Sequence, residues 1–254
     1  MTPLLVPPKV PETRSDRVVL RDISWSTYQA LVLELESQSG KHLTYDRGTL
    51  EISMPLPPHE RFKSWLRRII EIATEELEIE ICSLGSCTWS REDLQKGLEA
   101  DKCYYIQNES RIRGKMQIDL TVDPPPDLAI EVDISSPSLP RLPIYAALGV
   151  PEIWQWNGKQ IKLLQLVQGR YVERSQSLAL PSLNSEDIDR WLLEAQSMGE
   201  TSWAKAVRQL GCGVWGVGCG ELGRGNYSLF TSYALPLYIG TYALPLYLVG
   251  VNGR

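Results

Sequence analysis

The chain has 254 residues, 43% of them hydrophobic, which is enough apolar material for the core of one large domain or two small ones. Its formal net charge of −5 argues against a protein that coats nucleic acid through bulk positive charge, although a nuclease whose acidic ligands are neutralised by metal stays open. The five cysteines form no CxxC pair and there are only two histidines, so we expect no structural zinc site and a reducing, cytoplasmic location.

The N-terminal third predicts an arm, two helices and a hairpin. Residues 1–17 hold a short apolar patch interrupted by prolines, which predicts a flexible arm that is neither a signal peptide nor a membrane span. Apolar residues at helical spacing predict helices over 24–37 and 59–77. Between them, KHLTYDRGTLEIS predicts a β-hairpin over 41–53 that turns at Asp46-Arg47-Gly48.

The middle of the chain is rich in predicted strands. Residues 78–90 predict two strands or one long bent strand, and CYYIQN at 103–108 predicts another, with Asp101 just before it. The basic residues that follow, Arg111, Arg113 and Lys115, are more typical of a solvated loop than of a phosphate site. In DLAIEVDI at 127–134 the residues alternate strictly, which predicts a strand with Asp127, Glu131 and Asp133 on the face opposite its apolar residues.

The remainder of the predicted domain contains a helix, three further strands and a final helix. LPRLPIYAALG predicts a helix that ends at Gly149, and EIWQW, KLLQL and RYVERS predict strands joined by tight turns. A helix over 185–197 closes the domain. This order of elements predicts a mixed α/β (α+β) domain over 18–197 that opens with a helix and a β-hairpin.

Residues 198–254 have a different composition. We expect a helical linker, then a glycine-rich segment and two copies of YALPLY, which are too few for a solenoid. This tail is either an extension without a stable fold or an aromatic segment for self-association or membrane contact, and neither copy is long enough to span a bilayer.

The acids around the central strand raise the question of a metal site. Neighbouring carboxylates raise one another's pKa, so a cluster of them needs a compensating cation. Mg²⁺ commonly takes one or two protein carboxylates, with water and substrate phosphate completing its shell. If their strands are neighbours, Asp101 and Glu131 can approach each other across the sheet, but alternation alone is more typical of an antiparallel sheet with a solvated outer face.

The order GLEADKCYYIQN, PPPDLAIEVDISSPS and PIYAALGVPEIWQW resembles the Uma2 family, within the PD-(D/E)XK restriction-endonuclease-like superfamily, over about residues 24–193. This resemblance implies a restriction-endonuclease-like core, in which a mixed β-sheet is flanked by helices. It also implies Mg²⁺-dependent hydrolysis of DNA phosphodiester bonds, with Mn²⁺ as an alternative ion and with a homodimer allowed.

The resemblance implies particular site residues. The two metal-binding acids fall on Asp101 and Glu131, although Ala100 stands where the superfamily has proline. The position usually held by lysine is Asp133, and the cation moves instead to Arg141, which cannot act as a base.

Further positions of the motif are less specific. His59 matches a histidine of the family and joins the catalytic candidates, with Glu60 beside it as an accessory acid. Asp127 and Asp133 are accessory candidates as well. Ala100 and Arg141 depart from the superfamily pattern, so a catalytically silent nucleic-acid-binding or scaffold domain is the alternative function, and a soluble interaction module without a nucleic-acid role is a third.

Overall fold

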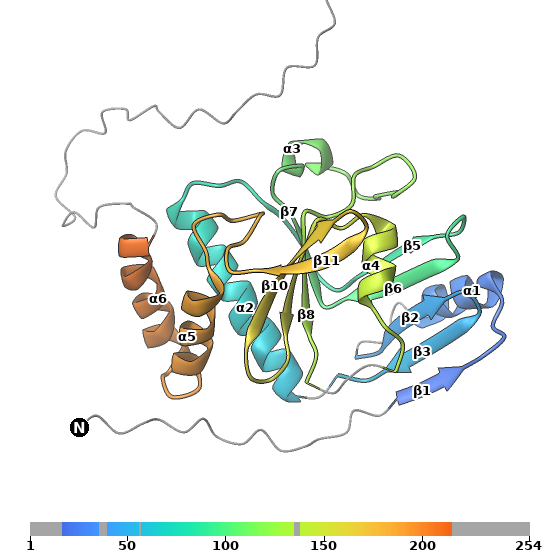
Figure 1. Ribbon diagram of the computed structural model, residues 1–254, viewed down its shortest axis with the longest axis horizontal. Coiled ribbons are helices and arrows are strands. Elements are labelled where there is room, and N and C mark those ends of the chain that lie inside the picture. Colours follow the sequence, from blue (N-terminus) through green and yellow to red (C-terminus); the bar gives the residue numbers. More distant parts are fainter. Residues whose placement is uncertain (1–16, 36–39, 56, 135–137, 215–254) are drawn as a thin grey trace, which may run out of the picture. The chain divides into compact units, whose positions relative to one another are not determined.

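The computed structural model describes residues 17–35, 40–55, 57–134 and 138–214, with side chains described as far as residue 209. The predicted arm, apart from Arg17, and the tail over 215–254 lie outside the described residues. Within them the fold is mixed α+β, with six helices and two β-sheets, as the sequence predicts (Figure 1). None of the described helices is both long enough and apolar enough to cross a membrane.

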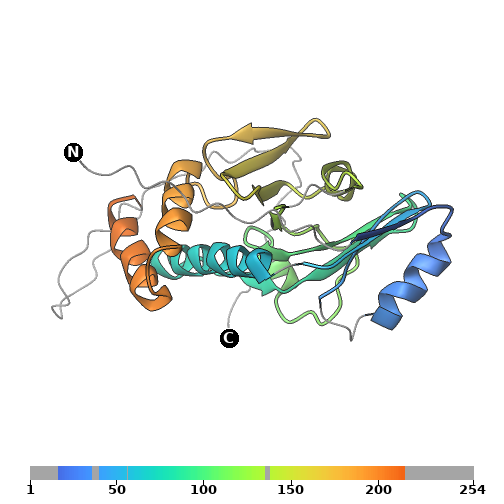
Figure 2. The same ribbon diagram turned by 90° about the horizontal axis from the view of Figure 1, so that it is seen from below.

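The first sheet is antiparallel and contains the predicted hairpin. Its strands run in the order β1 (Arg17–Leu20), β3 (Thr49–Ser53), β2 (His42–Asp46), β6 (Lys96–Ala100) and β5 (Cys87–Arg91). The hairpin between β2 and β3 turns where predicted, and both turn residues have positive φ, 43° at Arg47 and 88° at Gly48. Helix α1 (Trp25–Leu35) packs on one face of this sheet through Trp25 and Tyr28 (Figure 2).

The second sheet is mixed. Its strands run in the order β11 (Arg170–Arg174), β10 (Ile161–Val167), β9 (Glu152–Trp156), β8 (Leu128–Val132), β7 (Lys102–Tyr105) and β4 (Cys82–Leu84). Only the β8–β9 pair is parallel among these described strands. Helix α4 (Leu142–Leu148), which begins after β8 and ends at the left-handed Gly149, supplies the crossover that a parallel pair requires.

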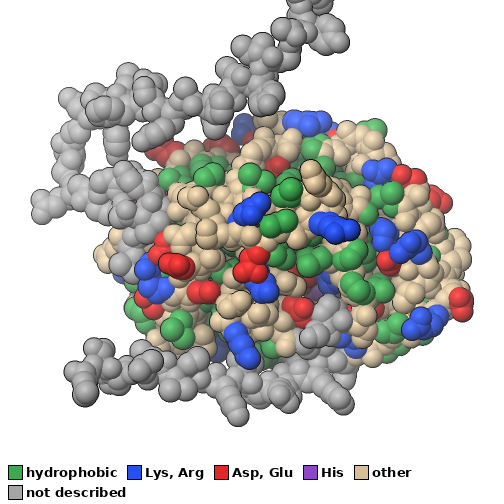
Figure 3. All heavy atoms as spheres, viewed as in Figure 1, with side chains coloured by type: hydrophobic (Ala, Val, Ile, Leu, Met, Phe, Trp, Pro, Cys, Tyr) green, Lys and Arg blue, Asp and Glu red, His purple; other side chains and the backbone are tan. Residues whose placement is uncertain are grey.

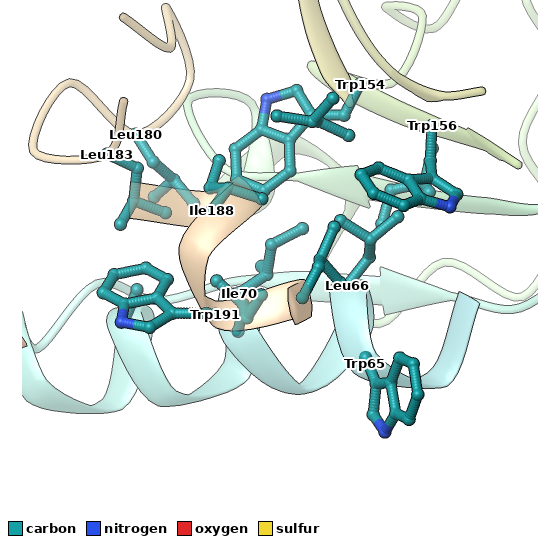
Figure 4. Close-up of a cluster of buried hydrophobic side chains, with 14 of the residues drawn as sticks. Trp65, Leu66, Ile70, Trp154, Trp156, Leu180, Leu183, Ile188 and Trp191 are labelled. Atoms are coloured by element: carbon teal, nitrogen blue, oxygen red, sulfur yellow. The ribbon is translucent and has the colours of Figure 1, made fainter. Parts of the chain in front are cut away.

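Helices cover both faces of the second sheet. Helix α2 (Pro57–Glu76), α5 (Ser185–Ala195) and α6 (Glu200–Val214) form one apolar layer with one face of β8 and β9, and α4 packs on the other face (Figures 1 and 2). The layer is built from large side chains because α2 presents an apolar stripe with a period near 3.6 residues. In Figure 4, Leu66 of this stripe lies near Trp156, and Ile70 lies between Leu66 and Trp191.

Burial of β8 on both faces corrects one expectation. All five residues of β8 are buried, because Leu128, Ile130 and Val132 meet the α2 layer while Ala129 meets the α4 layer. The solvated outer face that alternation allows is therefore absent. Glu131 lies on the α4 side, inside the protein, where an unpaired charge would be costly.

Other elements differ from the sequence expectations in their extent. Residues 78–90 form two strands that belong to different sheets, and β6 was not expected. The predicted helix over 59–77 begins earlier, at Pro57. Beyond residue 197, α6 packs on α2 and α5 with Trp203 fully buried, so this part of the chain contributes to the core and is not a linker. The helix α3 (Glu109–Ile112) is a short turn in the loop after β7.

The chain passes between the two sheets twice in this region. The chain leaves the second sheet at β4 and enters the first at β5, then returns from β6 to β7. Only Asp101 separates the end of β6 from the start of β7, and Ser86, between β4 and β5, donates a hydrogen bond to the Asp101 carbonyl at 3.3 Å. The fold therefore places the predicted acid at the junction of both sheets.

Candidate active site

Asp101 is 2% exposed, and each of its carboxylate oxygens has a histidine partner. His42 Nδ1, from the start of β2, lies 3.2 Å from Oδ1, and His59 Nε2, from the first turn of α2, lies 3.0 Å from Oδ2. The backbone N–H of Val132 donates to Oδ2 at 2.7 Å. The chain contains two histidines, and both converge on one carboxylate.

These contacts set the charge of the group. Burial raises the pKa of Asp101, but hydrogen bonds from His42 and His59 and their charges outweigh burial and hold the pKa well below its usual range. Burial lowers the pKa of His59, but the hydrogen bond and the charge of Asp101 reverse this effect and raise the pKa above 6.5. Asp101 is therefore a stable anion that favours protonated His59.

Glu131 is 6% exposed, and its contacts come from α4. Arg141 Nη2 donates to Glu131 Oε1 at 2.8 Å, and the buried hydroxyl of Tyr145 donates to the same oxygen. No hydrogen bond from the described residues reaches Glu131 Oε2. Burial raises the pKa of Glu131, Arg141 lowers it and the charge of Asp101 raises it, so that the pKa lies above its ordinary value.

Arg141, the residue just before α4, links Glu131 to the first sheet. Its Nη1 donates to Thr44 Oγ1 at 3.0 Å, and its Nη2 also donates to the carbonyl of Glu99 at 2.5 Å. Burial lowers the pKa of Arg141, but Glu131, Tyr145 and Asp101 raise it above its ordinary value. Arg141 Nε is buried and has no hydrogen-bond partner among the described residues, so one donor of this cation is uncommitted.

The strand register brings the two predicted ligands together. Lys102 on β7 pairs with Ile130 on β8, and continuing this antiparallel register by one residue sets Asp101 opposite Glu131. Directly opposite residues in an antiparallel pair have Cβ atoms about 5 Å apart. The bond from Val132 N–H to the Asp101 carboxylate shows the same proximity.

Two further acids, Glu51 and Asp133, lie near this pair. Glu51 on β3 is 3% exposed; it lies 3.5 Å from Arg17 and accepts the backbone N–H groups of Ser138 and Leu139 at 2.8 and 2.9 Å. Burial raises the pKa of Asp133, and so do the charges of Asp101 and Glu51, although Arg141 and Arg17 lower it. The site is therefore rich in carboxylate oxygens, the ligands that a hard divalent cation takes.

The donor set fits an open Mg²⁺ or Mn²⁺ site and does not form a closed one. Within the described part of the chain, no three His, Cys, Asp or Glu side chains are grouped to hold a metal ion. Mg²⁺ needs only one or two carboxylates when water and phosphate supply the remaining oxygens. Glu131 Oε2, which has no hydrogen-bond partner in the described part of the chain, beside the anionic Asp101 meets that requirement.

The accessory candidates have different surroundings. Asp127 accepts hydrogen bonds from the backbone N–H groups of Ile106 and Asn108 at 2.7 and 2.9 Å and from the Asn108 side chain at 2.6 Å. It precedes β8, whereas Glu131 lies near the strand's other end, so Asp127 fixes the loop after β7 and stands apart from the pair. Glu60 is half exposed and lies 3.4 Å from His59 Nδ1, at the rim of the site.

Three residues of the site were not singled out from the sequence: His42, Glu51 and Tyr145. The sequence contains a feature that could have identified two of them. His42 is one of only two histidines, and Tyr145 stands four residues after Arg141, the spacing that puts side chains on the same helical face. Glu51 had no local signal, because its partners Ser138 and Leu139 lie 87 and 88 residues away.

The histidines contribute little surface. Side-chain exposure is 8% for His42 and 14% for His59. Figure 3 accordingly shows only a small histidine area on the face drawn there. The Asp101 cluster is therefore largely enclosed by protein.

Comparison with known proteins places this site in a family. Among solved structures, a similar chain is a crystal structure described as a "putative nuclease belonging to DUF820" from Anabaena variabilis ATCC 29413, with 18% sequence identity and a TM-score of 0.41 over 59% of this chain and 91% of that chain. No protein with a curated description matches. The family model described as "Uma2: Putative restriction endonuclease" matches residues 25–194, more than half of the chain, and it includes every acid of the Asp101–Glu131 site. The protein therefore belongs to the Uma2 family of restriction-endonuclease-like nucleases.

Proposed function

We propose that this protein is a divalent-metal-dependent DNA endonuclease that hydrolyses phosphodiester bonds, with Asp101 and Glu131 as its metal ligands. One observation carries the proposal: the buried carboxylates of Asp101 and Glu131 lie opposite each other, next to the Lys102–Ile130 pair of β7 and β8. The family model that covers them is described as a restriction endonuclease. A bound Mg²⁺ or Mn²⁺ would polarise the phosphate and supply an activated water.

Arg141 and Tyr145 act on Glu131. Both donate to Oε1, which leaves Oε2 as the oxygen presented to a ligand. Since two nitrogens of Arg141 are committed to Glu131, Glu99 and Thr44, its main role is to position and neutralise Glu131. Its Nε–H is buried, and no hydrogen-bond partner among the described residues commits it.

His59 is suited to hold a proton. Its Nε2–H donates to Asp101, which leaves Nδ1 as the basic atom of the ring. Nδ1 has no hydrogen-bond partner among the described residues, and the Glu60 carboxylate 3.4 Å away favours a proton there. A histidine oriented by a buried carboxylate is the arrangement that general acid–base catalysis requires.

DNA is the proposed substrate, bound without bulk positive charge. The net charge is −5, and on the face in Figure 3 basic and acidic side chains are interspersed. Phosphate binding therefore depends on a few placed cations and on the metal ion. A homodimer and a cytoplasmic location stay predictions.

One observation favours the second candidate, a catalytically silent DNA-binding domain. Asp101 already has two histidine partners and Glu131 already has Arg141, so protein groups compensate both charges without metal. A chain that needs no metal to stabilise these acids can keep the fold after losing catalysis.

Plasmid cleavage tests the proposal. The full-length protein is incubated with supercoiled DNA and Mg²⁺ or Mn²⁺, beside Asp101→Asn and Glu131→Gln variants, and we expect the parent to nick and both variants to lose at least about 100-fold in rate. Glu152→Gln, a buried acid of β9 outside the site, is the matched control and should keep cleaving.

Each alternative result has a clear meaning. Equal cleavage by the parent and the Asp101→Asn and Glu131→Gln variants contradicts the assigned ligands. A parent that shifts DNA mobility but never cleaves supports the silent domain.

A further inference from the structure

Helix α2 carries a row of basic side chains that begins at the site. His59, Lys63 and Arg67 are spaced by four residues, so they lie along one stripe of the helix, with successive Cβ atoms about 6 Å apart. The row starts at His59, which contacts Asp101. Burial raises the pKa of Glu99, and the charge of Lys63 is among those that lower it.

Another basic side chain lies on the α2 face of the second sheet, because Lys102 on β7 pairs with Ile130, which packs in the α2 layer. Lys102 directly follows Asp101, is only 9% exposed, and holds its Nζ 5.4 Å from the centre of the Tyr104 ring. Among the described residues, no carboxylate lies within ion-pair distance of Lys102 Nζ. Burial and the charges of Arg67 and Lys63 lower the pKa of Lys102, whereas the charge of Glu71 raises it, as expected for a lysine that faces α2.

A lysine with so little exposed surface and no carboxylate within ion-pair distance among the described residues is unusual, because such charges are normally paired. The neighbouring Tyr104 hydroxyl is also buried without a hydrogen-bond partner. The acids nearby belong to α2 itself: Lys63 lies 2.8 Å from Glu60, and Arg67 lies 2.6 Å from Glu71. Pairs of this kind on a helix surface contribute about 0.5 kcal/mol, so phosphate can displace them.

We propose that Lys63, Arg67 and Lys102 form a track for the DNA backbone that leads away from Asp101 along α2. This inference rests on the proposed function for the identity of its ligand. The three cations would bind successive phosphates next to the one being cleaved, and Lys102 would gain the anionic partner that the described residues do not supply. The contacts are to phosphate, so they add affinity without sequence preference.

The salt dependence of DNA binding tests the track. Binding of the full-length protein to a short labelled duplex is measured by fluorescence anisotropy in EDTA, which prevents metal-dependent cleavage, over a series of salt concentrations. Each lost phosphate contact lowers the slope of log affinity against log salt by about 0.9. We expect a fall of about two for the Lys63→Gln/Arg67→Gln variant and about one more when Lys102→Met is added.

Arg61→Gln is the matched control. Arg61 is exposed on the same helix but lies over the Trp65 ring at 5.8 Å, away from the stripe, so its removal takes away one positive charge, as each substitution in the track does, and should leave the slope nearly unchanged. Lys63 is only partly buried and Arg67 is exposed, so their double variant keeps the test valid even if Lys102→Met fails to fold.

The outcomes separate the track from the proposed catalysis. A folded Lys63→Gln/Arg67→Gln variant with the parent's slope, an Arg61→Gln variant with an equal loss, or a parent that binds no DNA overturns the track. If the parent cleaves plasmid and the slope is unchanged, only the track fails. If the slope falls as expected and the parent never cleaves, the track stands and the proposed hydrolysis fails.

Discussion

At the residue scale, each acid of the site has a partner of its own from a separate element. Asp101 takes histidines from β2 and α2, whereas Glu131 takes Arg141 and Tyr145 from the region of α4. Because these groups are buried, removing one partner leaves a charge in a medium of low dielectric constant. The site therefore affects folding stability as well as chemistry.

Removing Arg141 should be strongly destabilising. Arg141→Ala leaves Glu131 buried with only the Tyr145 hydroxyl, so we expect the free energy of unfolding in urea to fall by about 3 kcal/mol or more. Arg141→Ala combined with Glu131→Gln should cost clearly less than the sum of the two single variants, because no unpaired charge remains. Additive costs would show that the pair is not coupled.

The stability contributed by His59 should depend on pH. Asp101 raises the folded-state pKa of His59 above 6.5, so the protonated form is stabilised by folding. The contribution is full below about pH 6.5 and disappears as the pH rises through the raised pKa. In urea unfolding without metal, the free energy of unfolding of the parent should exceed that of His59→Gln by the largest amount near pH 5.5 and by less near pH 8.5. A difference in free energy of unfolding that does not change with pH contradicts the His59–Asp101 ion pair.

At the scale of single elements, α1 is held on the first sheet by a close approach at β6. Tyr28 of α1 stacks on Tyr45 of β2, with ring centroids 4.7 Å apart, and its hydroxyl lies over Gly97. A Cβ at position 97 would clash with this hydroxyl and come within 2.9 Å of Ser90 Cβ. Glycine at this position allows the helix to pack closely.

Gly97→Ala should therefore lower the free energy of unfolding by about 1 to 3 kcal/mol, the usual cost of overpacking a core. Gly85→Ala is the control, because a Cβ there meets no atom within 4 Å and the backbone is not in the left-handed region. Urea unfolding of both variants checks the difference. Equal costs would contradict the close packing of α1.

At the scale of the whole domain, the described fold extends past the expected boundary at residue 197. Trp203 of α6 is fully buried, donates from Nε1 to the Trp191 carbonyl at 2.8 Å, and has its ring 6.5 Å from that of Trp65. The α2 helix is thus covered by α5 and α6 together. The domain depends on residues that its sequence pattern does not mark as core.

Trp203→Ala should cost about 3 to 5 kcal/mol, as expected for a large side chain removed from a core. The exposed Lys205→Ala on the same helix is the control and should stay within about 0.5 kcal/mol of the parent. Thermal and urea unfolding measure both. A negligible effect of Trp203→Ala would mean that α6 is a linker in solution.

The sequence alone determined the elements whose causes are local. The hairpin turn at Arg47-Gly48, the stripe of α2, the stop at Gly149 and the alternation of β8 each depend on residues within a few positions of one another. The family motif gave the candidates Asp101, Glu131, Arg141 and His59, and with them the class of function.

Tertiary structure alone decided which residues meet. The pairing of His42 with Asp101 and of Glu51 with Ser138 joins positions 59 and 87 residues apart, and no local pattern encodes such contacts. It also decided that Glu131 is buried, because α4 packs on the face of β8 that carries Glu131. The alternating sequence is compatible with exposure of that face to solvent. Local order follows from backbone and side-chain preferences over a few residues, whereas the partners and burial of a charged group follow from how distant segments pack.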